Sequence, residues 1–429
     1  MTDDRVFAKC AWQLIPFIMI LYLVNYIDRV NVGFAALTMN RDLGLSPGVF
    51  GFAAGVFSLS YCGFHLPATV ILHRVGAKRT VFFILASWGA FSAACAFAQG
   101  PVGLSVLRFL LGIAEAGFVP GMLLYLTYWF PQSYRARCTT NFQTGIPLAF
   151  VAGGPLSGFI LGMDGLVGLH GWQWLFLLEG LPAVLLAFAA LKLLPDGPAQ
   201  AEFLSSEEKA AVTARLRAED ASEHGNVRGA LRDVRVVALG IAGFGNILAL
   251  TGIQLWMPQI VQGAGFENLA TGFLVALPFV VSVPVMVFVG RSSDERQERI
   301  WHLAIPAVMS GAGLMTASIA ANDAMLLAGL FLAAIGSTVV VPLLNNLPGL
   351  FLGGAAAAGG IGLYLAITNC AGFFGPIVVG ILKQATGGYG FALAALAAGP
   401  LICAAIVLGL GHRVTPRSAA AVAEDGARA

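Results

Sequence analysis

The sequence predicts an all-α integral membrane protein, with twelve transmembrane helices in two six-helix bundles related by pseudo-symmetry. Of the 429 residues, 58% are hydrophobic and only 11% are charged, whereas roughly a quarter of the residues in soluble domains are charged. Stretches of about 20 apolar residues, the length that spans a bilayer core, recur twelve times along the chain. One long polar stretch divides these twelve into two sets of six, which predicts the two bundles.

The predicted spans follow one another with short connections. Proline and glycine inside several of them are tolerated, because neighbouring helices satisfy the freed backbone groups. The first span carries charge and lacks a small-residue cleavage site, so we expect it to remain in the mature protein. The spans lie near residues 11–37, 47–71, 80–98, 101–128, 139–162, 172–194, 236–262, 270–289, 301–320, 324–348, 355–382 and 389–411.

The polar stretch between the sixth and seventh spans holds 14 of the 46 Asp, Glu, Lys and Arg residues of the chain. Within it, Ser205 and Glu208 have the spacing of a helix N-cap. This spacing predicts a short amphipathic helix that lies in the membrane surface. The predicted domains are an N-terminal bundle (1–194), a cytoplasmic linker (195–235), a C-terminal bundle (236–412) and a cytoplasmic tail (413–429).

Lysine and arginine are concentrated on one side of the predicted membrane. If both termini are cytoplasmic, the tails, short loops and linker of that side hold twenty of the twenty-four basic residues. We therefore expect a multi-pass protein of the inner (cytoplasmic) membrane. The opposite side has Arg41 and Lys383, and the remaining two basic residues, Arg29 and Arg108, lie inside the bilayer.

A weak internal repeat supports the division into two halves. "GGPLSG" in the fifth span and "FGPIVVG" in the eleventh place Pro155 and Pro376 221 residues apart, and the same offset carries His73 onto Asp294. Parallel halves of this kind are typical of transporters that bind their substrate near the membrane midplane.

Five ionisable residues fall inside the spans of the first half. An ionisable side chain at the bilayer centre costs about 2.5–3.5 kcal/mol on insertion scales, so each needs a reason to be there. The second half has none away from the ends of its spans. The five are Asp28, Arg29, Arg108, Glu115 and Glu179.

Helical spacing groups these charges by face. Arg108 and Glu115 are seven residues apart, two turns along one face and about 10 Å in rise, so they can line one cavity without forming a close ion pair. Asn25 and Arg29 are four residues apart on one face of the first span, and Asp28 is offset from it.

Two interpretations fit these charges. In the first, Asp28, Arg29, Arg108 and Glu115 form an interhelical ion-pair network that only fixes packing. In the second, the arginines form an anion-binding centre, because a guanidinium presents a fork that matches a carboxylate, and the acids carry protons. A substrate that takes the arginine removes the cation that stabilises the charged acid, so anion binding and proton uptake favour each other.

The sequence lacks the motifs that are typical of several other function classes. Neither the six cysteines nor the six histidines have the spacing of a metal site, so we expect no metal and no cofactor. The chain has no GxxxxGK[ST] motif and no nucleophile beside a base, which argues against a primary pump and against an enzyme. The net charge of +2 does not indicate nucleic-acid binding. The short alanine-rich tail disfavours a membrane sensor.

The chain resembles the anion:cation symporter family of the major facilitator superfamily, whose bacterial members include tartrate, hexuronate, galactonate, phthalate and hydroxyphenylacetate permeases. The resemblance covers nearly the whole chain and implies alternating access around a central site. The matching stretches are "YIDRVNVGFAAL" (26–37), "RFLLGIAEAGFVPGMLLYLTYWFP" (108–131), "GWQWLFLLEGLPA" (171–183), "LWMPQIV" (255–261) and "GRSSDERQER" (290–299).

The resemblance also implies roles for individual residues. In one departure, His73 stands where the loop between spans two and three usually has an acid, which puts its gating salt bridge and pH response in doubt. Glu179 matches a family signature and is expected to make a packing or gating contact. The implied substrate-binding residues are Arg29, Arg108, Tyr61, Gln143, Asn369, Asn25, Tyr26 and Trp256; the proton-coupling residues are Asp28 and Glu115; and the gating-loop residues are His73, Arg74, Gly76, Arg79, Gly290, Asp294 and Arg299.

Together these observations predict a secondary active transporter that imports a small organic anion, a carboxylate, sugar acid or aromatic acid, by proton-coupled symport. An antiporter or exporter of organic anions or drugs is the alternative, since one fold can host both directions; a membrane sensor or enzyme has less support. The expected partners are the substrate anion, protons and the lipid bilayer, with no nucleic acid, and the chain is expected to be a monomer.

Overall fold

A computed structural model describes residues 2–131, 134, 138–139, 145–220, 232–352 and 354–414. Every regular element in these ranges is helical. Eleven helices within them are long and apolar enough to cross a membrane, and a shorter apolar helix, Leu148–Leu161, lies in the fifth predicted span. The prediction of an all-α membrane protein is confirmed.

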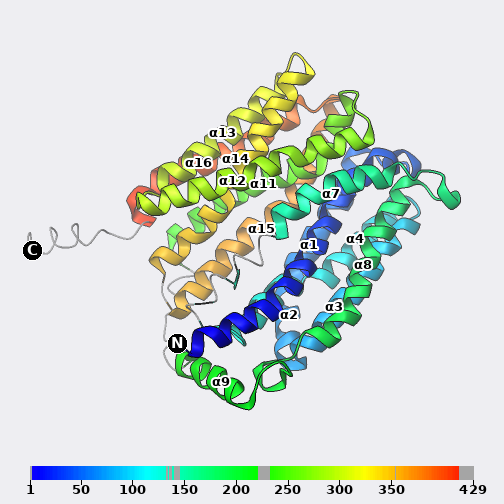
Figure 1. The fold of residues 1–429 in the computed structure, drawn as a ribbon. Helices are drawn as coiled ribbons and strands as arrows, with labels where there is room; N and C mark the ends of the chain where they lie inside the picture. The colour runs from blue at the N-terminus through cyan, green and yellow to red at the C-terminus, as the bar shows by residue number, and fades with distance from the viewer. Residues whose placement is uncertain are drawn as a thin grey trace, which may run out of the picture. The chain divides into compact units, whose positions relative to one another are not determined.

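The chain divides into two compact units, each described here by itself. Unit 1 comprises residues 1–222 and 257–276, and unit 2 comprises residues 223–256 and 277–429. Helices α11 and α12 each contribute residues to both units. The long helices (Figure 1) are α1 (Thr2–Asp42), α2 (Pro47–Val75), α3 (Ala77–Ala94), α4 (Gly100–Glu115), α5 (Phe118–Thr127), α7 (Gly145–Leu161), α8 (Gly171–Leu193), α9 (Ser206–Asp220), α11 (Val234–Gly263), α12 (Asn268–Glu295), α13 (Ile300–Ser318), α14 (Asp323–Phe351), α15 (Gly354–Thr386) and α16 (Gly390–Leu410).

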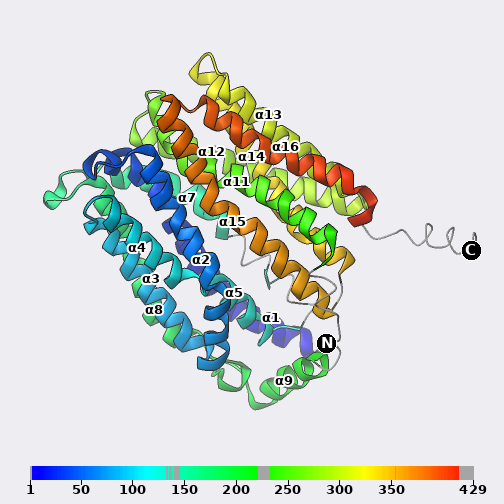
Figure 2. The ribbon, with the colours of Figure 1, turned by 180° about the vertical axis from the view of Figure 1, so that it is seen from behind.

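Unit 1 is built from pairs of helices packed side by side. In Figures 1 and 2, α3 lies along α8 and α2 lies along α4, while α1 contacts both α7 and α8. Glycine allows the first of these pairs to pack closely, because a Cβ on Gly89 of α3 would lie 2.8 Å from the carbonyl oxygen of Gly180 in α8. This contact fixes the position of the α8 turn that holds Glu179.

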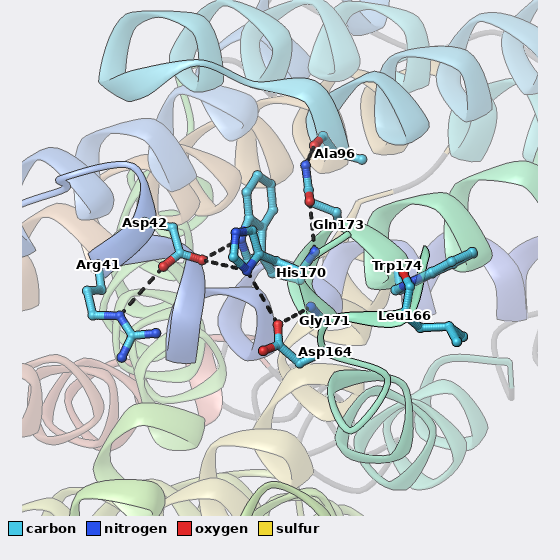
Figure 3. Close-up of polar contacts among 10 residues, drawn as sticks. Arg41, Asp42, Ala96, Asp164, Leu166, His170, Gly171, Gln173 and Trp174 are labelled. Carbon is cyan, nitrogen blue, oxygen red and sulfur yellow. Dashed lines mark hydrogen bonds and ion pairs between the residues drawn. The ribbon is translucent and has the colours of Figure 1, made fainter. Parts of the chain in front are cut away.

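Polar contacts hold the end of α1 against the start of α8 (Figure 3). Asp42, the last residue of α1, accepts a hydrogen bond from Trp172 Nε1 at 3.0 Å. His170 Nδ1 lies 3.7 Å from Asp42 and 3.5 Å from Asp164. The backbone N–H of Gly171 donates to Asp164 at 2.8 Å, so the first turn of α8 has an acceptor for one of its free N–H groups.

The predicted linker helix is present as α9. Its N-terminus has the predicted reciprocal cap: Ser205 N–H donates to the Glu208 carboxylate at 2.8 Å, and Glu208 N–H donates to Ser205 Oγ at 3.2 Å. The expectation that this helix lies in the membrane surface stays a prediction. Val212 is only 1% exposed and belongs to the apolar core of unit 1, so the apolar side of α9 is covered by protein.

Unit 2 packs α13 against both α14 and α16. Small residues allow the close approach of α13 and α14, because a Cβ on Gly313 would lie 2.6 Å from the Gly329 carbonyl oxygen. The polar groups buried between these helices are neutral: Ser310 and Ser337 share a hydrogen bond of 2.7 Å, and Asn246 of α11 donates to the Ser337 carbonyl at 3.1 Å. Among the described residues of unit 2, the buried polar side chains are therefore all uncharged.

Candidate functional site

Helix α1 directs Asn25 and Arg29 toward Glu115, the last residue of α4. Asn25 Nδ2 donates to Glu115 Oε1 at 2.6 Å, and Arg29 Nε forms an ion pair with the same oxygen at 2.5 Å. Glu115 is fully buried, and its Oε2 has no partner among the described residues. The helical spacing correctly placed Asn25 and Arg29 on one face, and the structure adds that their shared partner is on another helix.

A break between α4 and α5 places Glu115 at a helix end. Pro120 has no N–H to donate to the Ala116 carbonyl, and its ring disfavours a continuous helix through this turn. Ala116 N–H instead bonds to the Ile113 carbonyl, three residues back, and the regular pattern resumes with Gly121 N–H bonded to the Gly117 carbonyl at 2.9 Å. The proton-coupling candidate therefore lies at an interruption within one membrane span.

Aromatic rings surround the Arg29 guanidinium. Its Cζ is 4.3 Å from the ring centroid of Tyr61 and 5.3 Å from those of Tyr26 and Phe57. Such contacts favour a cation over a ring face. Arg29 Nη2 is buried and has no hydrogen-bond partner in the described part of the chain, so this donor is available to a ligand.

Arg108 faces the same phenylalanine from α4. It is 3% exposed, and its Cζ lies 4.7 Å from the Phe57 ring centroid. Within the described ranges it forms no ion pair, and its Nε is buried without a partner. Gly112 allows α2 and α4 to approach here, since a Cβ at that position would overlap Ser60 Oγ and the Phe57 carbonyl oxygen. The Phe57 ring is thus in contact with two guanidinium groups, those of Arg29 and Arg108.

Asp28 points to a different side of α1 from Arg29. It accepts hydrogen bonds from Trp88 Nε1 at 2.8 Å, from Asn31 Nδ2 at 3.0 Å and from Ser92 Oγ. These three donors satisfy a carboxylate without a direct cation partner. The adjacent acid and arginine of the sequence therefore belong to two separate clusters.

The other predicted substrate-binding residues are distributed over the chain. Tyr61 and Tyr26 lie beside Arg29, as described above. Trp256 of α11 is 1% exposed and donates to the Pro376 carbonyl at 3.1 Å within unit 2, so its indole N–H already has a partner. Asn369 is on α15, also in unit 2. Gln143 lies outside the described residues.

The first predicted gating loop joins α2 to α3 through Gly76, whose φ of 95° favours glycine. The side chain of His73 lies outside the described residues, and both arginines of this loop are exposed. An acid that the sequence did not suggest is close by: Asp196 accepts from the Lys78 N–H at 2.8 Å. A carboxylate at a helix N-terminus is stabilised by the free N–H groups there.

The second gating loop joins α12 to α13. Asp294 forms an ion pair with Arg299 at 2.5 Å, and Arg299 also donates to Ser293 Oγ at 3.0 Å. Ser293 Oγ in turn donates to the Glu298 carbonyl at 2.6 Å. Gly290 has open space where a side chain would be. The two positions related by the repeat therefore hold different residue types, His73 in the first loop and Asp294 in the second. The gating role of both loops stays a prediction.

Sequence reasoning missed several residues of these clusters. Phe57 gave no signal, because an apolar residue in an apolar helix resembles its neighbours. Asn31 could have been found, since it lies three residues after Asp28 and therefore on a similar face. Trp88 and Ser92 are four residues apart on the third span, but only the fold shows that they face α1.

Comparisons with known proteins agree with this architecture. A model of the Major Facilitator Superfamily matches residues 18–376. The chain is 41% identical over 425 residues to a protein of Agrobacterium vitis named as a candidate tartrate transporter, covering 98% of each chain. It is 38% identical over 390 residues to a quinolone resistance transporter of Acinetobacter baumannii, covering 90% of each.

Among solved structures, a bacterial homologue of the human lysosomal transporter Spinster superimposes with a TM-score of 0.79 at 15% identity, covering 95% of this chain and 98% of that one. The family resemblance in the sequence is therefore confirmed, as is the prediction that the protein is not an enzyme. The chain is a multi-pass membrane transporter that belongs to the major facilitator superfamily.

Proposed function

We propose that the protein imports a small organic anion together with protons across the inner membrane, with both termini in the cytoplasm. The observation that carries this proposal is the pair of arginines, Arg29 and Arg108, whose guanidinium groups both contact the Phe57 ring. Each has a buried nitrogen without a partner among the described residues, and only one of them, Arg29, is neutralised by an acid. The excess positive charge and the free donors suit a carboxylate.

Coupling follows from competition for Arg29. A substrate carboxylate that accepts a hydrogen bond from Arg29 competes with Glu115, whose Oε1 now holds that arginine at 2.5 Å. Once separated from the cation, the buried Glu115 carboxylate is unfavourable and takes up a proton. By linkage, proton binding then strengthens anion binding to the same extent. Symport requires this reciprocity, and the shared arginine provides it.

The relative named as a tartrate transporter supports an organic acid as substrate. A second candidate, export of aromatic anions or drugs, is favoured by the three rings around Arg29 and by the relative named for quinolone resistance. Both candidates use the same arginines. They differ in the direction of net transport and in the shape of the molecule bound.

Uptake into proteoliposomes tests the proposal. Tartrate, a sugar acid and an aromatic acid such as benzoate are supplied outside, with and without an inward proton gradient. Accumulation of one of these acids above its external concentration, only when the gradient is present, is the expected result. Gradient-driven loss of preloaded acid in exchange for protons would instead favour export. A first screen by thermal shift identifies the acid to use, because ligands raise apparent stability.

A further inference from the structure

Arg108 of α4 is a buried cation without an ion-pair partner among the described residues. It is only 3% exposed, and none of the ion pairs in these ranges includes it. Glu115 pairs with Arg29 instead, and Asp28 accepts three hydrogen bonds from neutral groups. A buried charge without compensation is costly, so another group must stabilise this guanidinium.

The ring of Phe57 is the group that contacts the Arg108 guanidinium. Arg108 Cζ lies 4.7 Å from the ring centroid, within the range of about 6 Å over which a ring face attracts a cation. Phe57 is itself only 6% exposed, and such contacts are strongest where water is excluded. In the described part of the chain this is the only ring over Arg108, whereas Arg29 has three rings and an acid.

The local structure holds Phe57 against α4. Arg108 and Gly112 are four residues apart and therefore on one face of that helix. A Cβ on Gly112 would overlap the Phe57 carbonyl oxygen and Ser60 Oγ, so glycine is needed for this approach. The Phe57 ring also stacks on Tyr61, with centroids 5.8 Å apart and an angle of 22° between the planes. The face of α4 that carries Arg108 is therefore packed directly on the turn of α2 that carries Phe57.

A ring and a carboxylate stabilise an arginine in different ways. A carboxylate accepts hydrogen bonds from the guanidinium N–H groups, often from two of them at once. A ring face attracts the positive charge and does not require those N–H groups as hydrogen-bond donors. Arg108 Nε is accordingly buried without a partner in the described ranges. An acid in the place of Phe57 would instead compete with a bound anion for the same donors.

We propose that Phe57 is a positioning residue that takes the place of an acid at Arg108. Its ring face stabilises the buried cation and leaves the guanidinium N–H groups free for a ligand. That the ligand is a carboxylate substrate rests on the proposed function, whereas the stabilisation of Arg108 by the ring does not. Phe57 acts on the substrate through the arginine, and its effect on Arg29 is smaller because that residue has further partners.

Fluorination of the Phe57 ring tests this role at nearly constant shape. Each fluorine atom withdraws electrons from the ring face and so weakens its attraction for a cation. Phenylalanine with one, two or three fluorine atoms is introduced at position 57 by nonsense suppression. We expect the unfolding midpoint of the ligand-free protein to fall stepwise, by about 1–2 °C in total. A midpoint that does not fall along the series would overturn the proposal.

Two controls separate the charge of Arg108 from general effects of fluorine. Phe34 of α1 is fully buried, and no described Lys or Arg lies over its ring, so fluorination there should not lower the midpoint. In Arg108→Gln the cation is absent, and fluorination at position 57 should lower the midpoint by less than half as much. An equal fall at position 34, or an undiminished fall in Arg108→Gln, would contradict the proposed contact.

Substrate affinity measures the positioning role. Thermal-shift titration with the identified acid should give a Kd about tenfold weaker for Phe57→Leu, because a guanidinium that is no longer held must be ordered when the substrate binds. Phe34→Leu should lower the unfolding midpoint and leave the Kd unchanged. A Phe57→Leu variant that binds like wild type would refute the positioning role. If no acid shifts the midpoint of wild type, the proposed function fails, while the fluorine series still decides whether Phe57 stabilises Arg108.

Discussion

The described residues of both units form helices, but the two units bury different side chains. In the described residues, every charged side chain that is buried lies in unit 1: Asp28, Arg108, Glu115 and Glu179. The buried polar side chains in the described part of unit 2 are all neutral, as in the contact between Ser310 and Ser337.

This difference suggests that the two units have different roles in transport. Buried charge is costly in a membrane protein and often marks a functional site, so the anion binding and proton coupling that we propose are assigned to unit 1. Under the same proposal unit 2 contributes neutral contacts. Among the described residues, the ion pairs of unit 2 lie at or near the ends of helices, as Asp294 and Arg299 do. The following predictions test this assignment, beginning with the largest expected effect.

Glu115→Gln should abolish proton-driven accumulation of the substrate, because the amide cannot take up and release the coupled proton. Substrate exchange without a gradient should continue, since both arginines remain. Counterflow and gradient-driven uptake in proteoliposomes measure the two activities. Full active accumulation by this variant would mean that another residue couples proton and substrate movement. It would contradict the assignment of coupling to Glu115 of unit 1.

Arg29→Lys and Arg108→Lys should each weaken substrate binding about ten- to a hundredfold, the loss expected for a hydrogen bond to a charged group. Lysine retains the charge but lacks the planar fork. Thermal-shift titration with the identified acid measures the affinity. Arg41→Lys is the control, because this arginine has an 85% exposed side chain and should bind like wild type. Unchanged affinity in both variants would favour the packing interpretation of the network.

Glu298→Ala in unit 2 should affect stability rather than transport chemistry. Glu298 accepts hydrogen bonds from the Trp301 N–H at 2.8 Å and from the His302 ring at 2.7 Å, and so caps the start of α13. Loss of such a cap costs about 1 kcal/mol. Thermal unfolding should show a lower midpoint, while coupling at saturating substrate stays intact.

The same variant has a pH signature. Partial burial alone would raise the pKa of Glu298, but the hydrogen bonds from Trp301 and His302 outweigh it and lower the pKa. The contribution of Glu298 to stability is therefore present above the ordinary glutamate pKa and is lost as the pH falls through the lowered value. The stability difference between wild type and Glu298→Ala should be full at pH 7 and should shrink in acid. A difference that is constant with pH would rule out this cap.

Lys9→Gln should have the smallest effect. Lys9 pairs with Glu208 at 2.8 Å on the exposed side of α9, and this contact, together with the Ser205 N–H, lowers the pKa of Glu208. Salt screens exposed pairs of this kind. The unfolding midpoint should change slightly at low ionic strength and by no measurable amount at physiological salt. A large change at high salt would mean that the contact has a role beyond surface electrostatics.

Much of the fold and part of the candidate site could be predicted from the sequence. Hydropathy and length identified the spans, and helical spacing placed Asn25 and Arg29 on one face. Spacing within one helix cannot identify a partner on another, so the pairing of Arg29 with Glu115 required the structure. For the same reason the separation of Asp28 from Arg29 was visible only once Trp88 and Ser92 were in place.

The central claim, that Glu115 of unit 1 couples proton and anion movement, is tested most directly by recording pH inside proteoliposomes while the identified acid is added outside. For wild type we predict that acid influx acidifies the lumen in proportion to the acid taken up, and that Glu115→Gln exchanges the acid without moving protons. Influx of the anion into wild-type vesicles with no change in internal pH, or equal proton movement in the two proteins, would contradict the claim.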